Sequence, residues 1–130
     1  MTEKSTALIR EVVNLPDILF VMDKGPGVME AWITSEETKV EAQGNWLAVE
    51  SRGWHCHLNL SEVEAIRFVE EPDVHDLKRQ AFSVRLLRKT GEPLVMIFFC
   101  EMYDDQGVLS TSRVERFRAL GARYGDSHSP

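Results

Sequence analysis

Residues 80–100, QAFSVRLLRKTGEPLVMIFFC, decide the fold because they contain two apolar runs joined by a short polar link. The link, residues 89–92, includes Gly91, which can adopt the positive φ of a tight turn. The second run, residues 94–99, has no polar residue. An antiparallel strand with one face in water alternates apolar and polar residues, so an unbroken apolar run predicts cover on both faces. The stretch therefore predicts a central β-hairpin with other elements packed on each side of it.

The chain before this hairpin predicts a helix and a series of short strands. Apolar residues between Leu8 and Val13 are spaced to form one stripe of a helix within residues 1–14, and Pro16 ends that helix. Residues 15–100 alternate short β-type runs with turn signals such as the Gly-Pro-Gly of residues 25–27. Residues 70–79 are polar and contain Pro72, so we expect them to be a connector that leads into the hairpin.

A second helix is predicted after the hairpin. Ser112 and Glu115 have the spacing of a capping box, and Val114, Phe117 and Leu120 supply a buried stripe over residues 110–125. At 130 residues the chain suits a single domain, residues 1–130. The predicted fold class is α+β: a large antiparallel β-sheet meander with an N-terminal helix and a C-terminal helix.

Composition and charge exclude several classes of protein. The net charge is −6, so the chain has no basic footprint and we expect no nucleic-acid partner. No apolar run approaches the 18 residues of a membrane span, and the first residues lack the core of a signal peptide. We therefore expect a cytoplasmic protein without membrane insertion, in which Cys56 and Cys100 are buried free thiols.

The strongest two-residue alternation lies in residues 54–60 and places His55 and His57 on the same strand face, about 7 Å apart. This pair is the candidate metal site. Zinc needs three or four ligands, and the other histidines, His75 and His128, fall in a predicted loop and in the tail, so a structural role for the pair is favoured. No catalytic residue is predicted, because the sequence has no GxSxG, P-loop or HExxH pattern.

Three segments together are similar to the repeat unit of the HemS/ChuX/HutX heme-utilisation family. They are GNWLAVESRGWHCHLNLSEVEAIRFVEEP (44–72), FSVRLLRKTGEPLVMIFF (82–99) and RVERFRALGARYG (113–125). The family pattern has a Gly-x-Trp strand, a strand that ends in His-Leu, here His57-Leu58, an apolar hairpin and a closing helix. The resemblance covers about two-thirds of the chain. It is a pattern of strand spacings and carries no catalytic signature.

The resemblance implies a protein that receives, stores or passes on heme. Larger relatives contain two such repeats, so a single-repeat chain is expected to form a homodimer by an isologous contact. Family members hold the iron with a histidine from the first part of the repeat, but this sequence has no histidine before residue 55. Met22 stands near that position, and a thioether can ligate iron. His57 matches the family's His-Leu position, and Arg67, Arg85 and Arg88 are the candidates to pair the propionates.

Three functions remain open at this point. The first is heme binding and intracellular heme utilisation or trafficking, without catalysis. The second is a dimeric interaction module of the same fold that has lost heme binding. The third is enzymatic heme breakdown, which requires an ordered iron ligand and an oxygen-accessible side of the ring.

Overall fold

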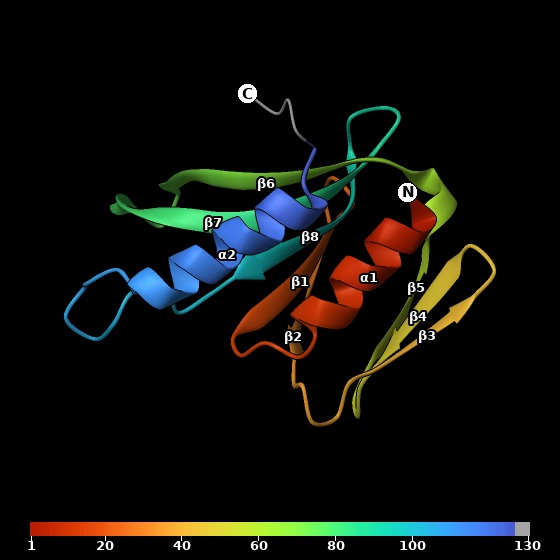
Figure 1. Cartoon of the computed structure of the whole chain (residues 1–130), viewed down its shortest axis with the longest axis horizontal. Helices are drawn as coiled ribbons and strands as arrows, with labels where there is room; N and C mark the ends of the chain where they lie inside the picture. The colour runs from red at the N-terminus through yellow and green to blue at the C-terminus, as the bar shows by residue number, and fades with distance from the viewer. Residues whose placement is uncertain (127–130) are drawn as a thin grey trace.

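The computed structural model describes residues 1–126 and contains two helices, eight strands and one short 3-10 turn (Figure 1). In chain order these are α1 (Thr2–Val12), β1 (Ile18–Asp23), β2 (Val28–Ile33), β3 (Lys39–Gln43), β4 (Trp46–Glu50), β5 (His55–Asn59), the 3-10 turn (Leu60–Glu62), β6 (Val63–Asp73), β7 (Asp76–Arg88), β8 (Pro93–Phe99) and α2 (Thr111–Tyr124). Antiparallel strands lie between an N-terminal and a C-terminal helix, which confirms the predicted α+β fold class. The assignment of residues 1–130 to one domain stays a prediction.

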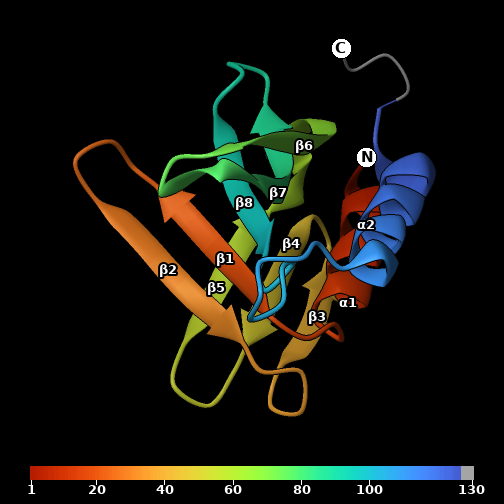
Figure 2. The same cartoon turned by 90° about the vertical axis from the view of Figure 1, so that its left-hand side faces the viewer.

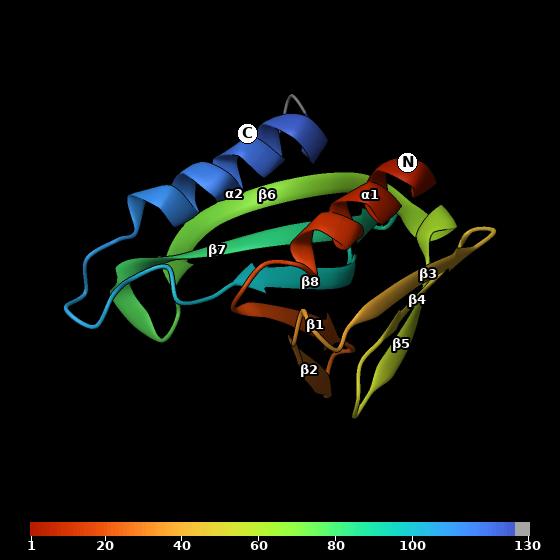
Figure 3. The same ribbon diagram turned by 60° about the horizontal axis from the view of Figure 1, so that its bottom comes forward.

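The strands form two sheets rather than one continuous meander. The large sheet has the order β2-β1-β8-β7-β6 and the small sheet has the order β3-β4-β5. The small sheet is inserted between β2 and β6 along the chain and is not hydrogen-bonded to the large one (Figure 3), but its Leu47, Val49 and Leu58 join the same core cluster. The apolar run of the hairpin is β8, which pairs with both β1 and β7 and is therefore the central strand of the large sheet.

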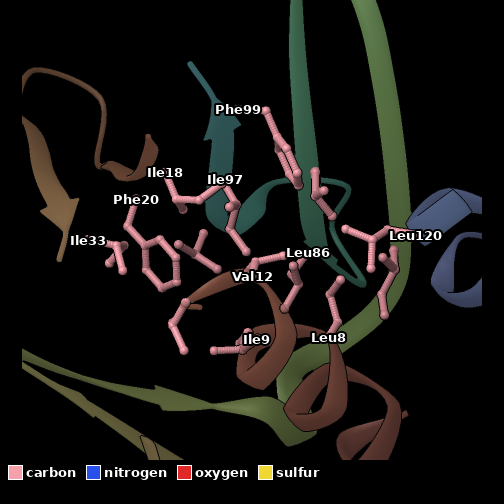
Figure 4. Close-up of a cluster of buried hydrophobic side chains, with 14 of the residues drawn as sticks. Leu8, Ile9, Val12, Ile18, Phe20, Ile33, Leu86, Ile97, Phe99 and Leu120 are labelled. Carbon is pink, nitrogen blue, oxygen red and sulfur yellow. The ribbon is translucent and has the colours of Figure 1, made fainter. Parts of the chain in front are cut away.

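Both helices cover the same face of the large sheet (Figure 2). Leu8, Ile9 and Val12 of α1 are fully buried there and point into a cluster with side chains of β1, β8 and α2 (Figure 4). The ring of Phe117 from α2 packs edge-on against three phenylalanines of the sheet, with centroids 5.0 to 5.4 Å apart: Phe68, Phe82 and Phe99. Burial of these apolar stripes fixes the helices on the sheet.

The prediction that residues 70–79 form a polar connector is wrong. β6 runs through Pro72 to Asp73, and β7 begins at Asp76 after a two-residue turn. Pro72 is tolerated because β6 is an edge strand, so a residue there can lack a ladder N–H. The acidic residues of this segment are held by ion pairs, since Glu70 binds Arg118 of α2 and Glu71 binds Arg85 of β7.

The expected cover on both faces of the hairpin is found on one face only. On the helix-covered face, Val95, Ile97 and Phe99 of β8 are buried. On the other face, Met96 and Phe98 are half-exposed, and neither belongs to the core cluster formed by residues 1–126. An apolar central strand is thus left partly open to solvent.

Candidate binding face

The uncovered face of the large sheet, here called the open face, consists of two neighbouring rows that cross all five strands. Strand register defines both rows. The first row is Trp32, Leu19, Phe98, Ser83 and Val69; the second row is Glu30, Val21, Met96, Arg85 and Arg67. The middle of the face is apolar, Trp32 at one border is 58% exposed, and arginines stand at the other border. Such a contiguous apolar patch with a charged rim is typical of a binding surface.

Arg85 is the most constrained charged side chain of the open face. Its Nη2 lies 2.5 Å from Oε1 of Glu71, while its Nε is buried and has no hydrogen-bond partner among residues 1–126. A buried donor without a partner costs free energy. Arg67 lies directly across the ladder from Arg85 and is exposed. This border therefore carries two guanidinium groups, of which that of Arg67 is exposed and that of Arg85 is paired with Glu71.

The structure places three of the predicted heme contacts away from the open face: Met22, Arg88 and His57, the last of which lies on β5 of the small sheet. Met22 is two residues beyond Phe20 on β1, so its side chain lies on the helix-covered side, where it packs against the core cluster. Arg88 ends β7 and donates to Glu62 at 3.2 Å. Within one chain, Met22 and Arg88 do not join Arg67 and Arg85.

The candidate metal residues lie on a third surface. His55 and His57 are exposed on the outer face of the small sheet, opposite the buried Leu58, and their ring centroids are 5.4 Å apart. His75 is at the turn between β6 and β7, and His128 lies outside the described residues. In the part of the chain that the structure describes, no three histidine, cysteine or acidic side chains gather as a metal site. A metal role for the pair stays a prediction.

Sequence reasoning did not single out Trp32, Met96 and Phe98 as site residues. In the single copy, Trp32 and Trp46 are 58% and 52% exposed, whereas Trp54 packs against the core cluster. The sequence did contain one signal. The fully apolar run of residues 94–99 predicts cover on both faces of its strand, but the two helices can cover only one face, so the other must be covered by something else.

One hollow lies at the end of the open face. Its volume is about 220 Å³, and its lining includes Phe98, Cys100 and Tyr103. Tyr103 accepts a hydrogen bond from the backbone of Gln80 at 2.9 Å, and the guanidinium of Arg79 lies 4.9 Å from its ring centre. This volume is below the roughly 300 Å³ at which pockets for small molecules begin. A single copy therefore offers a flat apolar face with a shallow hollow, and a larger ligand needs a second wall.

None of the helices formed by residues 1–126 is long and apolar enough to cross a membrane.

A protein-family model matches residues 6–127, nearly the whole chain. A search of the curated proteins finds no match. Solved structures share the fold at low sequence identity.

Three of these structures illustrate the similarity. The heme-binding protein ChuX has a TM-score of 0.74 at 15% identity over 94% of this chain and 73% of its own. Holo-PhuS, a heme-binding protein from Pseudomonas aeruginosa, gives 0.70 and 13%, over 95% of this chain and 33% of its own. ChuS, an E. coli heme oxygenase, gives 0.65 and 16%, over 93% of this chain and 35% of its own. The chain thus matches most of ChuX and about a third of the longer proteins.

Proposed function

Because the chain belongs to the HemS/ChuX/HutX heme-utilisation family as a single-repeat member, we propose that it binds heme for intracellular heme utilisation or trafficking. The observation that carries the proposal is the open face, which joins an apolar centre to an arginine border. A porphyrin presents the matching chemistry, since its ring is apolar and its two propionates are anionic. No catalytic step is assigned to the chain.

The proposed site is formed by two copies. The hollow at the end of the open face is too small for a porphyrin, and the open face has only one wall. A second copy that packs its own open face by two-fold symmetry supplies the other wall and covers Met96 and Phe98. Burial of the ring between the copies supplies the apolar part of the affinity, and Arg67 and Arg85 pair the propionates.

The remaining predicted heme contacts are tested by substitution. Met22, His57 and Arg88 reach a heme only if the assembly brings their surfaces to its edge. Single substitutions to alanine at these positions decide whether any of them contributes, because each lies on a surface different from that of Arg85.

The experiment is a titration of the purified chain with hemin, followed by the Soret band. We expect a saturable shift with one or fewer hemin per chain, and its loss in Phe98→Glu, which places a charge in the apolar centre of the open face. An unrelated acidic domain of similar size is the control for non-specific association. A titration curve equal to that of the control contradicts the proposal.

A second function is supported by the flatness of the open face. Val21 and Ser83 are already buried beneath their neighbours in the rows, so two faces can close on each other without a ligand between them. In that case the chain is a dimeric interaction module that has lost heme. A dimer that is colourless when purified from heme-supplemented cells and does not titrate with hemin favours this alternative. A stoichiometric coloured complex excludes it.

A further inference from the structure

If heme binds on the open face, an iron ligand there adds coordination to the burial of the ring, and the sequence pattern did not point to one. None of the histidines among residues 1–126 lies on the open face: His55 and His57 are on the small sheet and His75 is at a hairpin turn. The thioether of Met22 is turned toward the core on the opposite side of the sheet. A ligand for the iron must therefore come from the side chains of the two rows of the open face.

Met96 is the residue of the open face with a suitable atom in a suitable place. It lies on β8, the central strand, and is paired with Val21 on one side and Arg85 on the other. Its side chain is partly exposed and lies outside the core cluster, so a ligand on the open face can meet it without opening the core. A methionine thioether is polarisable, unbranched and an established axial ligand of heme iron.

Cys100, two residues beyond Phe98, is the other sulfur near this face. It follows the end of β8 and lines the hollow with Tyr103. Burial, together with the carboxylates of Asp17 and Glu101, raises the pKa of its thiol to about 11. A thiol that stays protonated at neutral pH is a poor metal ligand, since the thiolate is the ligating form. Met96 is therefore the better candidate.

Arg85 stands directly across the ladder from Met96 and is held by Glu71 through Nη2. Its Nε is buried within the chain without a partner among residues 1–126, so the guanidinium carries one donor that the chain itself does not satisfy. A carboxylate is the chemical group that satisfies a guanidinium best, by a charge-assisted hydrogen bond. A sulfur ligand and an unused cationic donor are thus neighbours on the same row.

From this juxtaposition we infer that Met96 is the axial ligand of the heme iron and that Arg85 binds a propionate of the same heme. The inference rests on the proposed heme-binding function and names the residues that carry it. Heme supplies the iron and the anionic groups. The chain supplies a thioether from its central strand, a guanidinium positioned by Glu71, and the apolar rows that exclude water from the ring.

The test compares leucine variants of three methionines in the hemin complex, in its oxidised and reduced forms. Met96→Leu keeps the volume and the apolar character of the side chain and removes the sulfur, so the fold is retained. We expect it to change the absorption spectrum of the reduced complex, because the thioether no longer coordinates the iron. Met29→Leu, on the exposed edge strand β2, is the matched control and keeps the wild-type spectrum.

Arg85 is tested by affinity. Arg85→Gln is expected to weaken hemin binding about tenfold, since one charge-assisted hydrogen bond is lost. Arg52→Gln is the control, because Arg52 is exposed near the small sheet and pairs with Glu37. Circular dichroism of each variant confirms that it is folded.

The outcomes separate the inference from the function. If the wild-type chain binds hemin and Met96→Leu has an unchanged spectrum, or Met22→Leu is the variant whose spectrum changes, the inference is wrong and heme binding stands. An Arg85→Gln affinity equal to that of Arg52→Gln removes the propionate assignment. If the wild-type chain binds no hemin, the proposed function fails and the ligand assignment fails with it.

Discussion

Glu11 of α1 and Tyr124 of α2 connect the two ends of the described chain. The Tyr124 hydroxyl donates to Oε2 of Glu11, and Nη1 of Arg123 donates to Oε1 at 2.8 Å. The Tyr124 hydrogen bond and then the charge of Arg123 lower the pKa of Glu11 below its usual 4.5. The same hydrogen bond raises the pKa of Tyr124 above its usual 10.0. The contact therefore stabilises the carboxylate beside the neutral phenol.

We predict that Tyr124→Phe lowers the free energy of unfolding by about 1 kcal/mol near neutral pH. A depressed acidic pKa gives stability that is present above pH 4.5 and is lost as the pH falls below it. A raised tyrosine pKa gives stability that is present below pH 10.0 and is lost as the pH rises further. Urea unfolding across pH 3 to 11 should thus show a difference between wild type and variant that is constant from about pH 5 to 9 and shrinks at both ends. A difference independent of pH would contradict this account.

The two cysteines give a second prediction at the scale of single residues. Burial raises the pKa of Cys56 to about 11, and Cys100 reaches a similar value. At pH 8 the thiolate fraction is then roughly a hundredfold smaller than for a free thiol with a pKa of about 8.5. We expect alkylation of the folded chain by iodoacetamide to be slower by about that factor, as followed by mass spectrometry. The urea-unfolded chain is the control and should react at the free rate; native labelling within tenfold of it would contradict the prediction.

Residue roles were only partly predictable from the sequence, and the reason is visible in β1 and β8. Alternation alone places Met96 opposite Ile97 and Val21 opposite Met22. Because all these side chains are apolar, the pattern cannot tell which of the two sheet faces the helices cover. Met22 was predicted as a heme contact from its place in the family pattern, and the apolar alternation could not show that its side chain lies on the helix-covered face.

At the scale of elements, Gly121, Gly125 and Asp126 hold α2 against β6. Gly121 lies against the ring of Phe68, where an added Cβ would be 3.2 Å from Cγ. After the helix, the backbone N–H of Asp126 donates to the carbonyl of Ile66, and the N–H of Ile66 donates to Oδ2 of Asp126, both at 3.0 Å. This exchange satisfies the outward-facing groups of Ile66 and protects the edge strand there.

We predict that Gly125→Ala destabilises the fold by about 1 to 2 kcal/mol. A Cβ at this position would lie 2.6 Å from the carbonyl oxygen of Gly121 and 3.1 Å from Cδ1 of Phe68 on β6, so both the helix end and its contact with the sheet must shift. Gly53→Ala is the control, because no atom lies within 4 Å of its added Cβ, and it should change stability by less than about 0.5 kcal/mol. Urea unfolding measures both. Equal stabilities of the two variants would show that α2 does not need the glycine.

Element positions were more predictable than residue roles. The helices and the hairpin were found because their apolar periods are 3.6 and 2 residues and their ends carry capping and turn residues. Residues 70–79 were misassigned because polar residues and Pro72 resemble a loop. Two long strands extend there in the structure, and their charges are neutralised by arginines from β7 and α2, Arg85 and Arg118. Partners distant in sequence cannot be read from local composition.

At the scale of the whole molecule, the open face has the size of a dimer interface. Its strands have 6, 6, 7, 11 and 13 residues. With about 3.3 Å per residue and about 4.8 Å between strands, the face covers on the order of 700 Å². A standard interface buries roughly 800 Å² on each partner, and its buried centre is depleted of charge. The row of Leu19, Phe98 and Val69 meets that description, and the border arginines stand at one side.

We therefore predict that the chain is a dimer in solution, with a mass twice the 14.9 kDa of one copy, and that Phe98→Glu dissociates it. Each copy would bury a glutamate in the contact without a compensating charge, whereas Phe98 is only partly buried in one copy, so the monomer stays folded. Val74→Glu is the matched control, since Val74 is 83% exposed at the tip of the β6–β7 hairpin, away from the rows. Light scattering after size-exclusion chromatography measures all three masses, with and without hemin. A single-copy mass for the wild type in both conditions, or a dimer lost in Val74→Glu and kept in Phe98→Glu, would place any contact between copies elsewhere on the molecule.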